Sequence, residues 1–367
     1  MLTRFLHIHS DQKFIHNTEL SFKNPEFENT IVYFGKLDVS FEGNIICLDY
    51  NYKNFEKVAN IAKNYDAIVF YSMCLQHAII CNKLPSKIIV FWRFFGAELY
   101  PYLYKEMLSR ESLNYVKNNY MHRILSITKH LLIDHMTADQ IFWKAVNRCN
   151  YMICLSDYEY HYLKEKFTIL PDYINVPYQP ISNDFIYPKD GKTIIVGHSK
   201  DIYGNHLEVL YQINRNSCRD EYFYYLPFSY AEYSKSYSRE VESVVSIWPT
   251  ANVIKNFISF EEYTKILQNS SAIVSNTYRQ MAMGNVFLAF NYGIKVYMNP
   301  KNVMYQWLID NGFYVFTIDQ LLHDMGNKEI SLTKGQMKEN QLAFNRLSSK
   351  FSVESFCKLL LTIVRNV

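Results

Sequence analysis

Apolar residues in the first half of the chain alternate between short continuous runs and helix-like spacing. The runs have the length and apolar content of buried strands and cover residues 5–9, 31–34, 45–48, 67–71, 87–95 and 151–155. Helical patterns cover residues 54–64, 74–82 and 102–150. Strands that alternate with helices are typical of a parallel sheet with crossover helices. We therefore predict one Rossmann-like α/β domain over residues 1–175.

The alternation breaks and then resumes in the second half. Four prolines interrupt residues 171–191, and we place an interdomain linker at residues 176–191. Strand-like and helix-like runs then follow one another through residues 192–345, which predicts a second Rossmann-like domain. Residues 353–364 are amphipathic, so we expect residues 346–367 to form a helix that packs back on the first domain.

Length and composition support this division and exclude several classes of protein. A chain of 367 residues exceeds what one core usually encloses. The net charge of +3 is too small to favour nucleic-acid binding. Seven cysteines without a CxxC pair argue against a disulfide framework or a zinc ribbon, and a reducing cytoplasm fits best. No window has the apolar length of a membrane-spanning helix or of a signal peptide, so we expect a protein that is not integral to a membrane.

The first candidate site lies between a predicted strand and a predicted helix, at residues 194–206. Gly197 follows the strand and would allow close backbone approach to a ligand, and the next amides would face an anion. Ligands of open α/β sheets bind at the carboxyl ends of strands. We therefore take these residues as candidates for binding a diphosphate: Gly197, His198, Ser199, Asn205 and His206. An ordinary strand-to-helix turn would explain the same pattern, because GxGxxG is absent.

The second candidate site, residues 275–285, also lies between a strand and a helix. Arg279 offers a guanidinium fork to a diphosphate, and Gly284 with Asn285 would present amides at a helix start. Such groups would stabilise the charge on a departing nucleoside diphosphate. Asn276 and Gln280 flank Arg279 and join the candidates. The alternative is a surface arginine in a polar loop.

Three residues of the first domain are candidates for activating an acceptor hydroxyl. Asp11 and His16 come soon after the first strand, and Glu98 follows the strand that ends at Phe95. A general base needs a carboxylate or imidazole within hydrogen-bond reach of the proton that it removes. Helix capping or loop hydrogen bonding is the alternative role of each residue.

A mixture of cationic and apolar side chains marks residues 104–148. This combination suits contact with anionic lipid headgroups. Helices that pack on the core with one solvated face would show the same composition.

At these motifs the sequence resembles glycosyltransferase family 56, whose members are TDP-N-acetylfucosamine:lipid II N-acetylfucosaminyltransferases. The matching stretches, in chain order, are His9-Ser10-Asp11 with His16-Asn17, Gly96-Ala97-Glu98-Leu99-Tyr100, Ile195-Val196-Gly197-His198-Ser199 with Asn205-His206, Leu226-Pro227, and Arg279-Gln280 with Gly284. Pro227 and the nearby Tyr230 therefore join the donor-binding candidates. The family carries Asp in place of Glu98 and Asn in place of His198.

The resemblance implies a GT-B fold of two facing Rossmann-like domains with a cleft between them. It implies transfer of an amino-deoxyhexose such as 4-acetamido-4,6-dideoxygalactose from a dTDP-sugar to a polyprenyl-diphosphate-linked saccharide. The expected mechanism is inverting and needs neither a metal nor another cofactor, with Asp11 as the first choice of base and Glu98 as the second. The expected pathway is enterobacterial common antigen, O-antigen or capsule synthesis, on the cytoplasmic face of the inner membrane as a peripheral protein.

Two other readings remain open. A catalytically silent protein of the same fold would bind a saccharide or an assembly partner, and would show no transfer when assayed. A nicotinamide-dependent sugar-modifying enzyme is disfavoured because neither strand–turn–helix carries GxGxxG.

Overall fold

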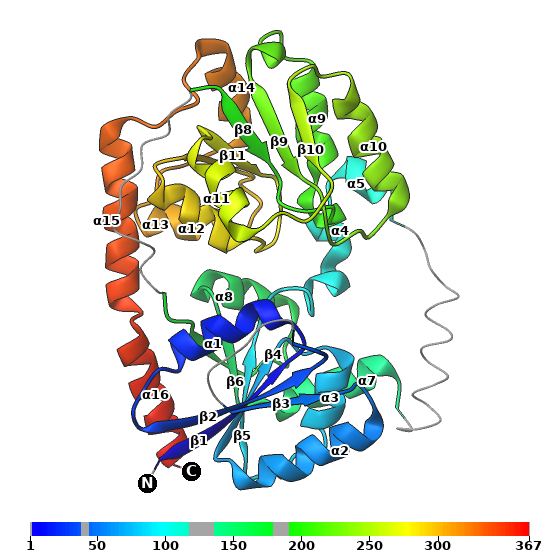
Figure 1. Ribbon diagram of the computed structural model, residues 1–367, viewed down its shortest axis with the longest axis vertical. Helices are drawn as coiled ribbons and strands as arrows, with labels where there is room; N and C mark the ends of the chain where they lie inside the picture. Colours follow the sequence, from blue (N-terminus) through cyan, green and yellow to red (C-terminus); the bar gives the residue numbers. More distant parts are fainter. Residues whose placement is uncertain (1, 38–43, 117–135, 179–190, 367) are drawn as a thin grey trace. The chain divides into compact units, whose positions relative to one another are not determined.

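The apolar runs of the first half form a seven-stranded sheet in the computed structural model, which describes residues 2–37, 44–116, 136–178 and 191–366 (Figure 1). All of its strands pair in parallel, in the order β3-β2-β1-β4-β5-β6-β7. The strands are β1 Thr3–His9, β2 Phe27–Phe34, β3 Asn44–Leu48, β4 Ala67–Tyr71, β5 Ile89–Arg93, β6 Tyr151–Cys154 and β7 Asp172–Asn175. Every residue of β4 is buried, because helices cover both faces of a parallel sheet.

Helices from both ends of the chain complete this first unit. They are α1 Ile15–Ser21, α2 Tyr52–Ile61, α3 Leu75–Cys81, α7 Ala138–Arg148, α8 Asp157–Lys166 and α16 Val353–Arg365, with the short 3-10 helices η1 Gln12–Phe14 and η2 Ala62–Asn64. The apolar face of α16, drawn in red in Figure 1, enters the same core as strands β1, β4 and β5. Phe356 packs edge-on against Phe22, with ring centroids 5.5 Å apart.

The second unit contains a six-stranded parallel sheet in the order β10-β9-β8-β11-β12-β13. Its strands are β8 Thr193–Val196, β9 Phe223–Pro227, β10 Ala251–Ile254, β11 Ala272–Ser275, β12 Lys295–Met298 and β13 Val315–Phe316. Its helices are η4 Ile202–Gly204, α9 His206–Asn214, η5 Arg219–Glu221, α10 Lys235–Ser246, α11 Phe260–Gln268, α12 Met283–Asn291, α13 Tyr305–Asp310, α14 Ile318–Asn327 and α15 Lys334–Lys350.

A segment of the first half of the chain belongs to this second unit. The first unit consists of Met1–Glu98, Asn119–Gln179 and Ser348–Val367, and the second of Leu99–Asn118 and Pro180–Leu347. The inserted segment holds η3 Tyr100–Leu103, α4 Tyr104–Met107 and α5 Arg110–Leu113. It packs there because it buries apolar side chains, among them Leu99, Tyr100, Met107 and Leu108.

These boundaries differ from the sequence-based expectation at two places. The predicted first domain ran without a break over residues 1–175, and helical sequence was expected from about residue 102 to residue 150. The structure instead ends α5 at Leu113 and gives Leu99–Asn118 to the second unit. Most of the predicted linker 176–191 and much of the cationic stretch 104–148 lie outside the described residues, at 179–190 and 117–135. Within the described ranges, none of the helices has the length and apolarity needed to cross a bilayer.

Candidate functional site

Each sheet has one place where the chain's crossovers leave in opposite directions. In the second unit this switch point lies between β8 and β11, and in the first it lies between β1 and β4. Ligands of open α/β sheets bind outside the carboxyl ends of the strands at such points. The loops that follow β8 and β11 contain most of the predicted diphosphate ligands, and Asp11 follows β1. Parallel pairing thus brings residues distant in sequence to one edge of each sheet.

Strained backbone marks the same edge of the second unit. Asn205, Ala231 and Ala282 have positive φ values of 47°, 62° and 50°, and they follow β8, β9 and β11. An L-residue in this left-handed region costs about 1–2 kcal/mol, and such strain clusters at functional sites. The strained residues therefore indicate a functional site in the loops after β8, β9 and β11.

The loop after β8 encloses a histidine between two glycines. A Cβ on Gly197, whose φ is +71°, would lie 2.3 Å from Nε2 of His206. A Cβ on Gly204 would lie 2.2 Å from Cε1 of the same ring. Distances this short are impossible between real atoms, so both positions require glycine to accommodate the imidazole. Gly197 is thus a packing requirement of the loop as well as a point of close approach.

His206 is held from its other side by Tyr237. Its backbone N–H donates to the Tyr237 hydroxyl at 2.8 Å, and that hydroxyl lies 3.0 Å from Nδ1. Nε2 is buried and has no partner among the described residues. Burial lowers the pKa of His206 to about 4, so the ring is neutral at pH 7.

Some backbone amides of the loop after β8 donate to other residues of the protein, and others are available to a ligand. Gly197 N–H donates to Val274 O at 2.9 Å, which continues the ladder with β11, and Lys200 N–H donates to Tyr230 O at 2.9 Å. The Gly197 amide is therefore not available to an anion. The prediction concerned the amides that follow Gly197, and it stays a prediction. In the described part of the chain, no backbone carbonyl accepts from the amides of His198 or Ser199.

His198 and Ser199 themselves contribute differently. Burial, together with nearby His206 and Arg279, lowers the pKa of His198 to about 3, so its ring is uncharged at neutral pH. Ser199 is buried, and its Oγ accepts from the Asp201 N–H at 3.3 Å. Ser199 therefore fixes the turn that leads to Asp201.

Arg279 is a buried cation whose charge has only one long contact with a carboxylate. Only 6% of its surface is exposed, yet its nearest carboxylate contact, from Nη2 to Asp201 Oδ2, is 3.5 Å long. Nη1 donates to the Gln280 carbonyl at 3.3 Å, and Nε has no partner among the described residues. Tyr203 and Tyr100 place their rings 5.0 and 5.8 Å from the guanidinium carbon. A buried guanidinium with unused donors is a strong anion-binding group.

Two predicted ligands, Asn205 and Asn276, are instead occupied in holding the loops together. Asn205 donates to Met107 O and Asn276 O at 3.1 and 3.3 Å and accepts from Ser109 N–H at 2.8 Å. Asn276 donates to Asn205 O and to Glu208, each at 2.8 Å, and accepts from Asn299 at 2.7 Å. Both side chains are buried, and these bonds link the loops to one another. Their assignment as donor ligands stays a prediction.

The remaining predicted donor ligands lie at the end of β9 and in the segments that follow β9 and β11. Pro227 is buried at the end of β9, and Tyr230 is about half exposed in the next loop. Gln280 is half-buried beside Arg279. Gly284 and Asn285 lie in the first turn of α12, whose N-cap Ala282 makes no side-chain capping bond. Gly284 is exposed, and a Cβ there would meet no atom within 4 Å, so no contact requires a glycine at that position.

In the first unit, Asp11 is engaged locally. Its carboxylate accepts from Lys13 N–H at 3.1 Å and pairs with Lys13 Nζ at 2.7 Å, so Asp11 caps η1. His16 lies on the exposed side of α1, 3.5 Å from Glu19. His16 is thus paired within its own helix, and its catalytic role stays a prediction.

Glu98 is held more firmly at the same sheet edge. Its Oε1 accepts from Met73 N–H at 3.2 Å and from Trp92 Nε1–H at 3.3 Å. Its Oε2 is buried without a partner in the described ranges. Desolvation raises the pKa of Glu98 above its ordinary value. A fixed carboxylate with one unused oxygen and a raised pKa has the properties of a general base.

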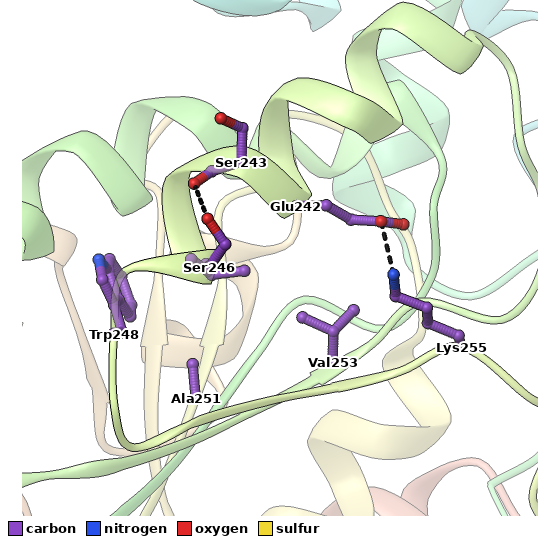
Figure 2. Close-up of a pocket in the computed structure, with 8 residues that line it drawn as sticks. Glu242, Ser243, Ser246, Trp248, Ala251, Val253 and Lys255 are labelled. Atoms are coloured by element: carbon purple, nitrogen blue, oxygen red, sulfur yellow. Dashed lines mark hydrogen bonds and ion pairs between the residues drawn. The ribbon is translucent and has the colours of Figure 1, made fainter.

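A separate cavity of about 410 Å³ lies between α10 and the edge strand β10 (Figure 2). Its charged lining residues, Glu242 and Lys255, pair with each other at 2.6 Å. None of the predicted site residues lines it. We therefore assign the candidate site to the carboxyl ends of β8 and β11. Among the described residues, no three His, Cys, Asp or Glu side chains lie close enough together to hold a metal ion.

Sequence reasoning missed three contributors to this site. Asp201 lies in the first candidate stretch but was not selected, and Tyr203 follows it by two residues. Tyr100 comes from the inserted segment and reaches Arg279 only because that segment folds into the second unit. No local pattern could have predicted that contact.

Comparison with known proteins gives the family of this chain and its fold. The family model described as 4-alpha-L-fucosyltransferase glycosyl transferase group 56 matches residues 164–354, slightly more than half of the chain. The match includes both loops of the candidate site.

Solved structures resemble the whole chain at low sequence identity. HepE of Anabaena, in complex with UDP and glucose, has a TM-score of 0.66 at 10% identity and covers 100% of both chains. A glycosyltransferase from Rickettsia africae has a TM-score of 0.63 at 11% identity, covering 100% of this chain and 98% of that one. The lipopolysaccharide outer core galactosyltransferase WaaB has a TM-score of 0.60 at 11% identity, covering 98% of this chain and 99% of that one. These likenesses confirm the predicted GT-B fold class, with two parallel-sheet α/β units.

Proposed function

Because this chain belongs to the 4-alpha-L-fucosyltransferase family, glycosyl transferase group 56, we propose a specific sugar transfer for it. The protein is a nucleotide-sugar-dependent glycosyltransferase. The proposed donor is a dTDP-linked 4-acetamido-4,6-dideoxygalactose or a related amino-deoxyhexose. The proposed acceptor is a polyprenyl-diphosphate-linked saccharide in bacterial surface polysaccharide synthesis, as in enterobacterial common antigen, O-antigen or capsule. The observation that carries the donor half of the proposal is the buried, under-compensated guanidinium of Arg279.

The proposed mechanism is a single inverting displacement. The acceptor oxygen bonds to C1 of the donor sugar while the bond from C1 to the β-phosphate oxygen breaks. The hydroxyl proton passes to a carboxylate of the first unit, and dTDP leaves with the bonding electron pair. Arg279 would neutralise the charge that develops on the departing diphosphate, with the His198 and Ser199 amides as further donors. This arrangement calls for no metal ion, because a protein cation supplies the charge.

The geometry favours Glu98 over Asp11 as the base, which reverses the order expected from the sequence. Asp11 is paired with Lys13, whereas Glu98 has one oxygen without a partner among the described residues. The raised pKa of Glu98 also makes it a better proton acceptor than an ordinary carboxylate.

Substitution of Glu98 by Gln is expected to lower kcat for transfer by roughly 10²–10⁴-fold, because the amide cannot accept the proton. Glutamine keeps an oxygen for the Met73 and Trp92 donors, so the fold should be retained. Because the pKa of Glu98 is raised, wild-type activity should fall with decreasing pH from above the ordinary glutamate range. The measurement is incorporation of labelled sugar into a lipid-linked product across pH.

Asp11→Asn is the matched control and should change kcat by less than about threefold. The opposite pattern, an inactive Asp11→Asn with an active Glu98→Gln, would return the role of base to Asp11. A silent binding protein would show no transfer in the wild type either.

We also propose that the protein works in the cytoplasm, on the inner face of the membrane as a peripheral protein. The support is chemical, since a polyprenyl-linked acceptor is anchored in a bilayer and its saccharide lies at the surface. The cationic and apolar residues of 104–148 would suit that surface, although 117–135 lie outside the described residues.

A further inference from the structure

Asp201 lies beside the proposed diphosphate ligand Arg279, where a negative charge would repel the diphosphate. It lies in the loop after β8, and its Oδ2 is 3.5 Å from Nη2 of Arg279. A donor diphosphate bound to Arg279 would bring two or more negative charges close to this carboxylate. Like charges at such distances repel strongly where water is largely excluded.

The carboxylate is fixed by its own turn and not by Arg279. Asp201 Oδ1 accepts from Tyr203 N–H at 3.0 Å, and its own N–H donates to Ser199 Oγ at 3.3 Å. The bond from Tyr203 caps η4 and holds the carboxylate, and the bond to Ser199 fixes the backbone of Asp201. Asp201 therefore cannot move away without losing its cap.

Arg279 is likewise positioned by groups other than Asp201. The Tyr203 and Tyr100 rings lie 5.0 and 5.8 Å from its guanidinium carbon, and the Gln280 carbonyl accepts from Nη1. The contact with Asp201 is long and single, whereas an optimal arginine–carboxylate pair is bidentate at about 2.8 Å. Burial raises the pKa of Asp201, and Arg279 opposes that rise only in part. The geometry of the pair is therefore not that of a strongly stabilising salt bridge.

We propose that Asp201 is a resident counter-ion that competes with the nucleoside diphosphate for Arg279 and sets its affinity. The competition lowers the affinity for the dTDP product, so that dTDP leaves after transfer. This inference rests on the proposed function, because it takes Arg279 as the diphosphate ligand. No covalent step is involved, since one anion replaces another on the same cation.

Asp201→Asn tests this role with little structural change. The amide oxygen can still accept from Tyr203 N–H, so only the charge is removed. We expect dTDP and inorganic pyrophosphate each to bind about tenfold more tightly to the variant by isothermal titration calorimetry. Affinity for thymidine, which lacks the diphosphate, should stay the same. A residue that merely supported the fold would weaken binding when changed.

Two further variants keep the outcomes separate. Asp220→Asn removes a carboxylate beside Arg219, before β9 and at the opposite edge of the sheet, and should leave dTDP affinity unchanged. Arg279→Met should abolish dTDP binding. If Arg279→Met binds dTDP as wild type does, Arg279 is not the diphosphate ligand, and the donor half of the proposed function fails with the inference. If Arg279→Met loses binding but Asp201→Asn binds dTDP equally or more weakly, only the role of Asp201 is overturned.

Discussion

Replacing Arg279 by methionine is expected to lower kcat/KM for sugar transfer by roughly 10³-fold. The change removes the charge and all five N–H donors from the carboxyl end of β11, where the leaving diphosphate would bind. Arg279→Lys keeps the charge but loses the planar fork and the unpartnered Nε–H, so it should retain more activity, at about a tenth to a hundredth of wild type. Steady-state transfer kinetics with a dTDP-sugar would measure both effects.

A second arginine of the same unit provides the matched control. Arg219 also lies near an aromatic ring, Trp248 at 5.8 Å, and pairs with Asp220 at 2.7 Å, but it precedes β9 at the amino edge of the sheet. Arg219→Met should change kcat/KM by less than about twofold. The double variant Arg279→Met/Asp201→Asn guards against misfolding, because it removes both members of the buried pair. Near-normal kcat/KM in a folded Arg279→Met protein would exclude Arg279 from the donor site.

Substitution of Gly197 by alanine is expected to lower the free energy of unfolding by about 3 kcal/mol or more. The φ of +71° is costly for any L-residue, and the new Cβ would lie 2.3 Å from Nε2 of His206. The ring cannot retreat, because Gly204 lies against it and Tyr237 bonds to its residue. Urea denaturation of the purified variant would give the change in free energy.

Gly284→Ala is the matched substitution without a clash. No atom lies within 4 Å of its Cβ position, and it lies in the first turn of α12, where alanine is favourable or neutral. Against a His206→Ala background, where the clash is absent, Gly197→Ala should cost only about 1–2 kcal/mol, from the backbone conformation. Equal stability of the Gly197→Ala and Gly284→Ala proteins would contradict the packing of His206 described above.

The fold was largely predictable because buried parallel strands are continuous apolar runs. The run at residues 67–71 coincides with β4, and the run at residues 31–34 lies within β2. Strand β10 was not predicted, because it is the edge strand of its sheet and its residues are only half-buried or exposed. The placement of Leu99–Asn118 in the second unit could not be predicted either, since it depends on contacts such as Ser109 with Asn205, 96 positions apart.

The candidate site was predictable in its loops but not in its individual roles. Gly197 and Arg279 were identified from their positions after strands, because the chemistry of a turn is local. Gly197 is required because the His206 ring packs against it. The amides that remain available to a ligand are those of His198 and Ser199. Asn205 and Asn276 are of a residue type that often binds ligands, but their side chains hydrogen-bond to other groups of the protein. Hydrogen-bond partners are set by three-dimensional packing, which a linear motif does not contain.

Titration of nucleoside diphosphates into the full chain tests most directly whether the second unit holds the donor's diphosphate through Arg279. Thermal denaturation is the measurement, because a ligand that binds the native state stabilises it by about 2.7 kcal/mol at a hundred times its Kd. We expect dTDP to raise Tm of the wild type more than UDP or GDP does, and we expect no rise with any of them for Arg279→Met. An equal rise of Tm with dTDP in the wild type and in Arg279→Met would contradict this expectation.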